Sequence, residues 1–298
     1  MARLPAPPPR GRAGRLRGPS APLWSDRRTG PGLVITRLVA ALVALAVLLP
    51  AIVWGGELAL EIIVPIAALV CLSEYASMAF PTDRWGMGGA LILGWAGLYA
   101  GALYAPPELL FVVLGLVVSG ALIWQTLRPG EALEQTANHT GRLLLGITWM
   151  SLLASVVLLR REDSGLAWLF LVMAISWLGD TGGYFAGKYL GSHKLYPRIS
   201  PKKTWEGVVG GVTLATMGTF AVRWIGLPQL SVIDCLILGP TLCLVGVVGD
   251  LAESMLKRSF QVKDSGWIMP GHGGLLDRID SLLFVTPLLY AWVRTMEA

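Results

Sequence analysis

Residues 232–280 of the chain read VIDCLILGPTLCLVGVVGDLAESMLKRSFQVKDSGWIMPGHGGLLDRID. The first part, 232–248, is almost wholly apolar, and a helix that crosses the roughly 30 Å hydrocarbon core of a bilayer needs about 20 such residues. The second part is a dense cluster of acidic and basic side chains around a glycine-rich turn, and another apolar run follows it. Because charge is costly beside a bilayer, this pattern predicts a membrane helix that leads into a functional site. Glycine with cations is typical of phosphate binding, and paired aspartates are typical of a divalent metal site.

The composition extends this prediction to an all-α, polytopic integral membrane protein. Hydrophobic residues make up 54% of the 298-residue sequence and charged residues 14%, with a mean hydropathy of +0.62. Soluble domains carry about 25% charged residues, so the composition excludes an ordinary soluble domain. We expect the sixth and ninth apolar runs, which are short, to continue into the polar motifs beside them. About nine runs predict transmembrane helices, at 33–54, 58–80, 85–104, 109–127, 143–159, 166–178, 208–227, 232–248 and 281–293.

The N-terminal 30 residues differ from the rest of the chain. They contain seven arginines and one acidic residue, Asp26, and they are rich in Pro and Gly, so we expect a disordered tail. The arginines allow two interpretations, nucleic-acid binding or retention in the cytoplasm by the positive-inside rule. We favour the second interpretation and expect no nucleic-acid partner.

A cytoplasmic tail followed by nine crossings determines on which side each loop lies. Four loops then fall in the cytoplasm, at 81–84, 128–142, 179–207 and 249–280. The last two are long and rich in Lys and Arg, as the positive-inside rule requires of cytoplasmic loops. The expected division of the chain is a tail (1–30), N-terminal transmembrane helices (31–176) and a region that carries the polar motifs (177–298).

The first polar motif lies directly after the sixth apolar run. Residues 182–188 nearly match the phosphate-binding loop G-x4-G-K, but Tyr189 stands where Ser or Thr would hold magnesium, and no strand precedes it. We therefore reject the phosphate-loop interpretation. The glycines are equally consistent with close packing of two helices. Asp180 lies at the expected helix end near the membrane surface, and its role stays open between function and structure.

The second motif reads SPKKTWEG at 200–207. Ser200 as an N-cap, followed by proline, predicts the start of a helix whose first turn contains Lys202 and Lys203. The helix dipole disfavours cations at this end, so two lysines there indicate a bound phosphate. The alternative is that the lysines only anchor the helix on the cytoplasmic side, and we prefer the phosphate site.

The third motif is the charged cluster quoted first. Asp250 and Glu253 are three residues apart, as are Asp277 and Asp280, so each pair shares one face if its segment is helical. Four such carboxylates suit one or two Mg²⁺ ions that also hold substrate phosphates. The alternative is a structural ion-pair network with the neighbouring basic residues. His272, in the glycine turn, is a candidate general base, phosphate donor or packed loop residue.

These motifs resemble those of a known family. The run S-x-L-K-R-x4-K-D-x-G-x2-M-P-x-H-G-G-L-x-D-R-I-D, at 254–280, is similar to the signature of the phosphatidate cytidylyltransferase, or CDP-diacylglycerol synthase, family. The G-D-L-x-E-S block at 249–254 and the SPKKTWEG block resemble two further blocks of that family. The resemblance covers about residue 177 to the C-terminus, with Met269 as a small departure from the expected Leu, Ile or Phe.

The resemblance implies the reaction CTP plus phosphatidate to CDP-diacylglycerol plus pyrophosphate with Mg²⁺. It also implies a multi-helix enzyme of a bacterial-type cell membrane, often a homodimer, with its active site on the cytoplasmic face. Whether a monovalent ion takes part stays open. Asp250 and Asp277 are the implied main metal ligands, with Asp280 and Glu253 as weaker candidates. The candidate catalytic residues are Asp250, Asp277, Lys263, His272 and Arg278. The candidate substrate-binding residues are Asp180, Ser200, Lys202, Lys203, Thr204, Lys257, Arg258, Gly273 and Gly274.

Elementary chemistry agrees with this implied reaction. The phosphate of phosphatidate is already anionic near neutral pH, so no serine or cysteine nucleophile is required. The task is to position two polyanions and to neutralise charge, which basic residues and metal ions do. Two alternatives remain: another membrane enzyme that uses CTP or a lipid phosphate, such as a polyprenol kinase, and a secondary transporter. A transporter is disfavoured because the charges cluster in two loops and no inverted repeat is visible.

Overall fold

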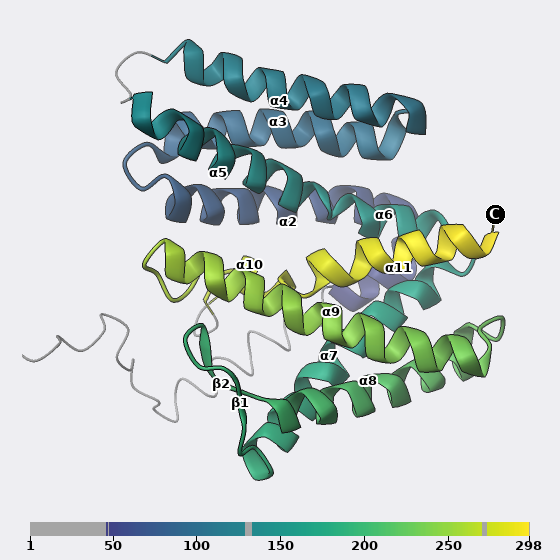
Figure 1. The fold of residues 1–298 in the computed structure, drawn as a ribbon. Helices are drawn as coiled ribbons and strands as arrows, with labels where there is room; N and C mark the ends of the chain where they lie inside the picture. Colours follow the sequence, from purple (N-terminus) through teal and green to yellow (C-terminus); the bar gives the residue numbers. More distant parts are fainter. Residues whose placement is uncertain (1–45, 47, 129–132, 270–272, 298) are drawn as a thin grey trace, which may run out of the picture.

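The computed structural model describes residues 46, 48–128, 133–269 and 273–297, and these form a helical protein with one small hairpin (Figure 1). Within the described residues, seven helical stretches are long and apolar enough to cross a membrane, which agrees with the predicted all-α, multi-pass membrane protein. Five are single helices: α2 (Gly56–Ala79), α3 (Arg84–Tyr104), α7 (Gly165–Tyr189), α8 (Trp205–Gly226) and α9 (Val232–Ser259). The other two are composite: the short 3-10 turn η1 (Pro107–Leu109) with α4 (Leu110–Thr126), and α5 (Leu133–Ser151) with α6 (Ala154–Arg161).

These stretches correspond to seven of the nine predicted runs. Most of the first run, 33–54, lies outside the described residues, as does the arginine-rich tail 1–30. The ninth run forms α11 (Leu282–Glu297), whose 16 residues are few for a straight crossing of the hydrocarbon core. The number of nine crossings therefore stays a prediction.

Two helices extend well past their apolar runs and into the polar motifs. Helix α7 continues from the sixth run to Tyr189, and α9 continues from the eighth run to Ser259. The expected continuation of the sixth run into the motif beside it is confirmed. The predicted loops 179–207 and 249–280 are wrong at their starts, because the first 11 residues of each are helical. Basic side chains in the last turn of each helix favour this extension, since cations interact well with a helix C-terminus.

The prediction of a helix start at Ser200 is wrong. Residues Ser200–Thr204 form strand β2, which pairs antiparallel with β1 (Lys194–Tyr196). Helix α8 begins at Trp205, and the hydroxyl oxygen of Thr204 caps it by accepting a hydrogen bond from the Gly207 N–H at 3.1 Å. The strand places both lysines before the N-cap, outside the first turn of α8, and that turn instead contains an acid, Glu206, which the helix dipole favours.

Glycines explain the close packing of α7 on α8. A Cβ added at Gly182 would overlap the carbonyl oxygen of Gly210, and one at Gly211 would lie 2.7 Å from the carbonyl oxygen of Gly179. Small residues of this kind let two helix backbones approach each other within a membrane. Because 182–188 is continuous helix, the rejection of the phosphate-loop interpretation is confirmed.

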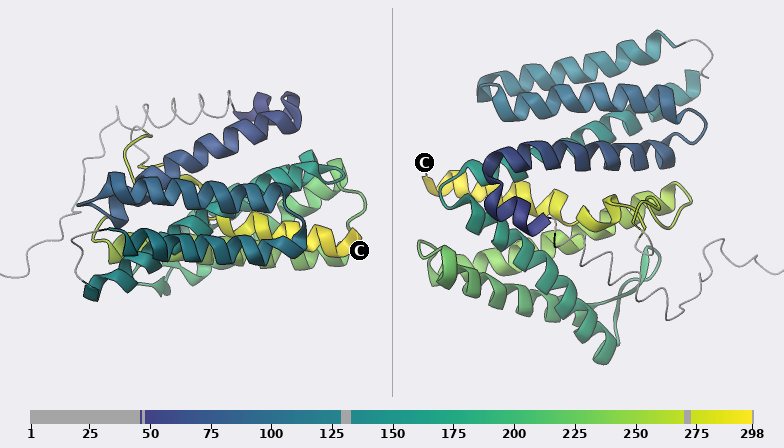
Figure 2. Two further views of the ribbon diagram at one scale, coloured as in Figure 1. Left: turned by 90° about the horizontal axis from the view of Figure 1, so that it is seen from above. Right: turned by 180° about the vertical axis from the view of Figure 1, so that it is seen from behind.

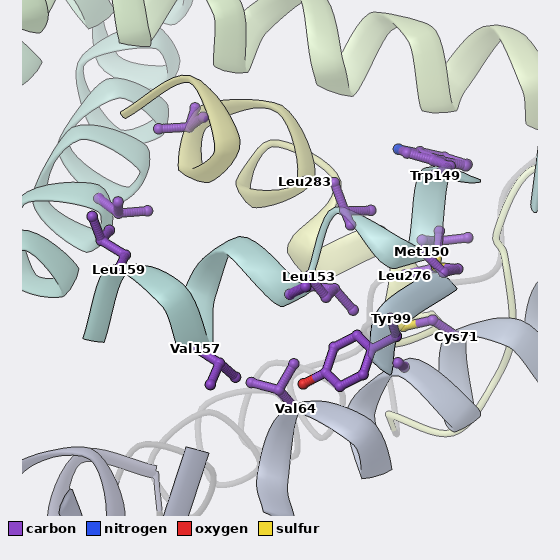
Figure 3. Packing of buried hydrophobic residues seen from close by; sticks show 14 of the residues in the cluster. Val64, Cys71, Tyr99, Trp149, Met150, Leu153, Val157, Leu159, Leu276 and Leu283 are labelled. Carbon is purple, nitrogen blue, oxygen red and sulfur yellow. The ribbon is translucent and has the colours of Figure 1, made fainter. Parts of the chain in front are cut away.

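The polar connections gather at one end of the helical bundle. The α2–α3 turn, the β1–β2 hairpin and the connection from α9 to α10 (Leu276–Ile279) lie at this end, and the C-terminus lies at the other (Figures 1 and 2). Buried residues join the two halves of the chain: Leu276 of α10 lies near Cys71 of α2 and Met150 of α5 (Figure 3). The fold thus brings the polar motifs to one surface of the bundle.

Candidate active site

The polar end of the bundle contains a cavity of about 270 Å³ where α7, α9 and α10 meet. The cavity brings together side chains from the first and third motifs, which are about 70 to 100 residues apart in the sequence. Five of its lining residues are aspartates and two are basic, so the cavity is strongly polar and carries charges of both signs. The lining residues are Asp180, Asp250, Lys257, Asp264, Asp277, Arg278, Asp280 and Ser281.

The second motif reaches the cavity through one ion pair. The ammonium of Lys203, on β2, lies 2.7 Å from Oδ2 of Asp250 on α9, and it also donates to the carbonyl oxygen of Val247 at 3.5 Å. Both side chains keep some exposure, 24% for Lys203 and 36% for Asp250. The hairpin therefore places a cation beside a carboxylate that lines the cavity.

Gly249 positions Asp250 next to the other acidic pair. A Cβ at Gly249 would lie 2.7 Å from the ring of Phe284 and 3.2 Å from the carbonyl oxygen of Asp280. A larger residue would therefore push α9 away from the start of α11. Close approach at this glycine keeps Asp250 and Asp280 in the same cavity.

Lys257 lies at the centre of a buried ion-pair triad. Its ammonium contacts Oδ1 of Asp277 at 2.5 Å and also pairs with Glu253, one turn earlier on α9. The exposed fractions are 11% for the Lys257 side chain, 6% for Asp277 and 1% for Glu253. Breaking a buried pair by removing one partner leaves an uncompensated charge and costs about 3–5 kcal/mol. The triad therefore fixes the separation of α9 and α10.

The other oxygen of Asp277 is held by backbone donors. Oδ2 accepts hydrogen bonds from the N–H groups of Ser265 at 3.0 Å and Gly274 at 2.8 Å. Burial alone would raise the pKa of the Asp277 carboxyl, but the Lys257 ammonium and these N–H groups together hold its pKa below the ordinary value. Gly273 turns the chain here with φ of +90°, and a Cβ would lie 2.5 Å from Oδ2 of Asp277. This aspartate is thus built into its site as an ionised group.

Asp280 has the opposite electrostatic character. Burial, and next the charge of Asp250, raise the pKa of Asp280 to about 7, although the N–H of Ser281 donates to its Oδ1 at 2.7 Å. Two neighbouring carboxylates that disfavour each other's charge are stabilised by a cation placed between them. The cavity therefore contains one aspartate, Asp277, that is held in its ionised form. It also contains one, Asp280, whose ionised form a nearby positive charge would stabilise.

The remaining predicted residues lie in several different places, at the cavity and away from it. Arg278 lines the cavity and is exposed, whereas Lys202 and Lys263 are exposed and are not among its described lining residues. Arg258 donates to the carbonyl oxygen of Val262 at 3.1 Å, close to the end of α9. Ser200 is half-buried on β2, Thr204 is the buried cap of α8, and Gly273 and Gly274 surround Asp277. His272 lies outside the described residues.

The predicted metal ligands are only partly brought together. Asp250, Asp277 and Asp280 line the cavity, whereas Glu253 is buried against Lys257. Carboxylate oxygens are the ligands that Mg²⁺ prefers, so the donor set fits that ion. Among the residues that the structure describes, no three His, Cys, Asp or Glu side chains are already gathered closely enough to hold a metal. In this structure Asp250 is paired with Lys203, and Asp277 is paired with Lys257.

Several residues of this region were not assigned a role from the sequence, although Asp264 belongs to the charged cluster that the sequence singled out. Asp264 and Ser281 line the cavity, and Ser265 donates its N–H to Asp277. Glu74 comes from α2, about 200 residues away in sequence, and accepts three hydrogen bonds from the α9–α10 connection. Its one available signal was an acidic residue within an apolar run, which by default indicates function.

The sequence of the chain is similar to those of known proteins. A sequence model of the cytidylyltransferase family matches residues 35–296. A phosphatidate cytidylyltransferase of Staphylococcus aureus (strain COL) is 35% identical over 257 residues, which are 85% of this chain and 96% of that protein. One of Bacillus subtilis (strain 168) is 46% identical over 129 residues, or 43% of this chain and 48% of that protein. One of Staphylococcus epidermidis is 44% identical over 128 residues, or 43% of this chain and 49% of that protein. The chain thus spans about half the length of the Bacillus subtilis and Staphylococcus epidermidis relatives. It spans nearly the whole length of the Staphylococcus aureus relative.

Proposed function

This chain belongs to the cytidylyltransferase family, and we propose that it converts CTP and phosphatidate to CDP-diacylglycerol and pyrophosphate. The observation that carries the proposal is the aspartate-rich cavity at the polar end of a membrane helix bundle, within a chain similar to phosphatidate cytidylyltransferases over nearly its whole length. Such a site gives a nucleotide access from water while a lipid phosphate reaches it from the bilayer surface.

The reaction needs positioning and charge neutralisation more than proton transfer. An anionic oxygen of the phosphatidate phosphate attacks the α-phosphorus of CTP and forms the new P–O bond. The bond between the α-phosphorus and the oxygen that bridges to the β-phosphate breaks, and that oxygen leaves with pyrophosphate. Negative charge builds up on the α-phosphoryl oxygens and on the leaving group, so preorganised cations accelerate the step.

The basic residues at the cavity supply part of this positive charge. Lys257 is held in place by Asp277 and Glu253, and Lys203 is held by Asp250, so neither ammonium needs to be ordered when substrate arrives. Arg278 is exposed at the cavity and presents a planar fork of donors that suits phosphate oxygens. Charge that is positioned in advance is the main contribution these side chains make to the transfer.

Magnesium is part of the proposal. Asp250, Asp277 and Asp280 would hold one or two Mg²⁺ ions, and the presence of these three carboxylates in the lining of one cavity supports this. Bound Mg²⁺ supplies charge neutralisation at the phosphates of CTP and orients them.

We further propose that the polar end of the bundle faces the cytoplasm of a bacterial-type cell. The high Lys and Arg content of 179–207 and 249–280 supports this orientation, and CTP is supplied from that side. The homodimer implied by the family resemblance stays a proposal.

The proposed function is tested by a product assay in which two possible acceptor lipids are supplied in separate reactions. Purified protein in mixed micelles receives CTP, Mg²⁺ and either phosphatidate or diacylglycerol, and CDP-diacylglycerol, pyrophosphate and CDP are measured. We expect CDP-diacylglycerol and pyrophosphate in equal amounts with phosphatidate, and no turnover with diacylglycerol. Release of CDP with phosphorylation of diacylglycerol would identify a lipid kinase instead, and no product with either acceptor would overturn the proposal.

A further inference from the structure

Glu74 is an acidic residue in the last third of a membrane-length apolar helix, five residues before the helix ends. It belongs to α2, and only 4% of its surface is exposed. A carboxylate in such a place costs several kcal/mol unless its oxygens are hydrogen-bonded. Intramembrane acids that persist at this cost are usually functional, so the partners of Glu74 indicate what it does.

Among the described residues, the three hydrogen-bond donors to Glu74 lie between the end of α9 and the first residue of α10. Oε2 accepts from the hydroxyl of Ser265 at 3.2 Å and from the N–H of Leu276 at 2.9 Å, and Oε1 accepts from the N–H of Leu275 at 3.0 Å. A carboxylate can only accept hydrogen bonds, and all three partners present donors to it. The acceptor oxygens of Glu74 are therefore satisfied by the donors of this one segment.

Asp277 binds the same short segment from the other side. Ser265 donates its N–H to Asp277 and its hydroxyl to Glu74. Gly274 donates to Asp277, and the next two N–H groups in the chain, of Leu275 and Leu276, donate to Glu74. Two carboxylates thus share one run of donors, and the position of one limits the position of the other.

Two glycines are fitted to this arrangement. A Cβ at Gly274 would lie 2.5 Å from Oε2 of Glu74, and one at Gly266 would overlap its Oε1. The backbone can approach the carboxylate this closely because these residues lack side chains. Glu74 itself is not among the described residues that line the cavity, so it acts on the site through the segment it holds.

We infer that Glu74 is a positioning residue of the transfer reaction: it holds Ser265 and Gly274–Leu276 so that Asp277, and through it Lys257, keeps its place in the cavity. This inference rests on the proposed function, since it assigns Glu74 to the same site. It also makes α2, outside the region 177–298 that carries the sequence motifs, part of the catalytic machinery.

The test compares Glu74→Gln with Glu61→Gln in the full-length protein. Gln keeps the size of the side chain but turns an NH₂ group toward at least one N–H donor. Glu61 is a matched control, because it lies on the same helix about 20 Å away and accepts from Arg161 at 2.6 Å. We expect Glu74→Gln to lower kcat by roughly 100-fold, the size of effect that a 1 Å misplacement produces, with KM for CTP changed much less. Glu61→Gln should stay within about threefold of wild type, as expected for a change outside the site.

Failure of this inference and failure of the proposed function would give different results. Thermal unfolding identifies folded variants, and kcat is expressed per folded enzyme. A folded Glu74→Gln variant with near wild-type kcat would overturn the inference, whereas an inactive wild type would overturn the proposed function. If Glu74→Gln fails to fold, Ser265→Ala removes one of the three bonds and should lower kcat roughly fivefold, as expected for one hydrogen bond. Unchanged kcat in Ser265→Ala would then contradict the inference.

Discussion

The Asp277 carboxylate combines burial with a lowered pKa, and three groups make this combination stable. One oxygen contacts Lys257, and the other accepts from the N–H groups of Ser265 and Gly274. Glu253 contacts the far side of the same ammonium. A buried charge is tolerated only when it is paired and hydrogen-bonded, and here both conditions hold. A residue so fully satisfied is positioned before any substrate binds.

Asp277→Asn should remove activity while the protein stays folded. The amide keeps the shape of the side chain but loses the charge that pairs with Lys257 and that would hold a metal ion. We expect kcat to fall by at least 10²–10³-fold, the range seen when one preorganised electrostatic group is lost from an active site.

Asp234→Asn provides the control for that variant. Asp234 belongs to the capping box at the start of α9, away from the cavity, and Asn is an acceptable replacement near a helix N-terminus. Rates measured with CTP and phosphatidate, together with thermal unfolding, distinguish the two variants. A folded Asp277→Asn protein with near-normal rates would remove Asp277 from the site.

Among the helices, α9 has a length that matches its double role. Its 28 residues span about 42 Å, which exceeds the roughly 30 Å of the hydrocarbon core, so part of the helix must project into the interface. Its apolar part comes first, and Asp250 and Lys257 follow in the projecting part. The helix therefore anchors the site in the membrane and carries its charged residues to the surface.

The β1–β2 hairpin distinguishes two adjacent lysines that look equivalent in the sequence. Lys203 points to Asp250 and Val247 of α9, whereas Lys202 is exposed. We expect Lys203→Ala to lower kcat/KM by roughly 10-fold to 100-fold, because hydrogen bonds to charged groups contribute about 1.5–3 kcal/mol. Lys202→Ala should lower it by less than about threefold, as for an exposed charge.

Steady-state kinetics with CTP and phosphatidate varied in turn would measure both lysine variants. Protein yield and thermal unfolding give the reference for stability. If both variants lost activity equally, or if Lys203→Ala lowered yield and rate in parallel, the lysines would serve as membrane anchors instead.

At the level of the entire chain, the bundle divides into a polar end and an opposite end. The hairpin and the α9–α10 connection lie at the first, and the α8–α9 connection and the C-terminus lie at the second (Figures 1 and 2). Labelling of single introduced cysteines tests the orientation, because the three native cysteines are buried and give little background. In intact cells an impermeant maleimide should label Gln229→Cys, and it should label Arg198→Cys only after permeabilisation. The reverse pattern would place the site outside the cytoplasm.

The sequence predicted the helices well because hydropathy over some 20 residues is a strong signal. It also predicted which segments meet, since Asp180, Asp250 and Asp277 do line one cavity. It failed at 200–204, where Ser-Pro is a common helix start and strand pairing with 194–196 prevailed.

Glu74 could not be linked to the site from sequence. Its partners are two backbone N–H groups and one serine hydroxyl almost 200 residues away, and backbone donors carry no sequence signature. For the same reason the sequence could offer the ion pairs of Lys257 only as an alternative, a structural ion-pair network in place of a metal site. Spacing identifies residues on one helix face, whereas contacts between segments depend on tertiary packing.

The identity of the phosphorus atom that passes from CTP to the lipid distinguishes the proposed reaction from its nearest alternative. The purified protein would be incubated with phosphatidate, Mg²⁺ and CTP labelled either at the α- or at the γ-phosphorus, and label in the extracted lipid would be counted. Cytidylyl transfer predicts label in the lipid from α-labelled CTP alone, with the γ-label released in pyrophosphate. Label in the lipid from γ-labelled CTP, or from neither, would contradict the assignment of this cavity to cytidylyl transfer.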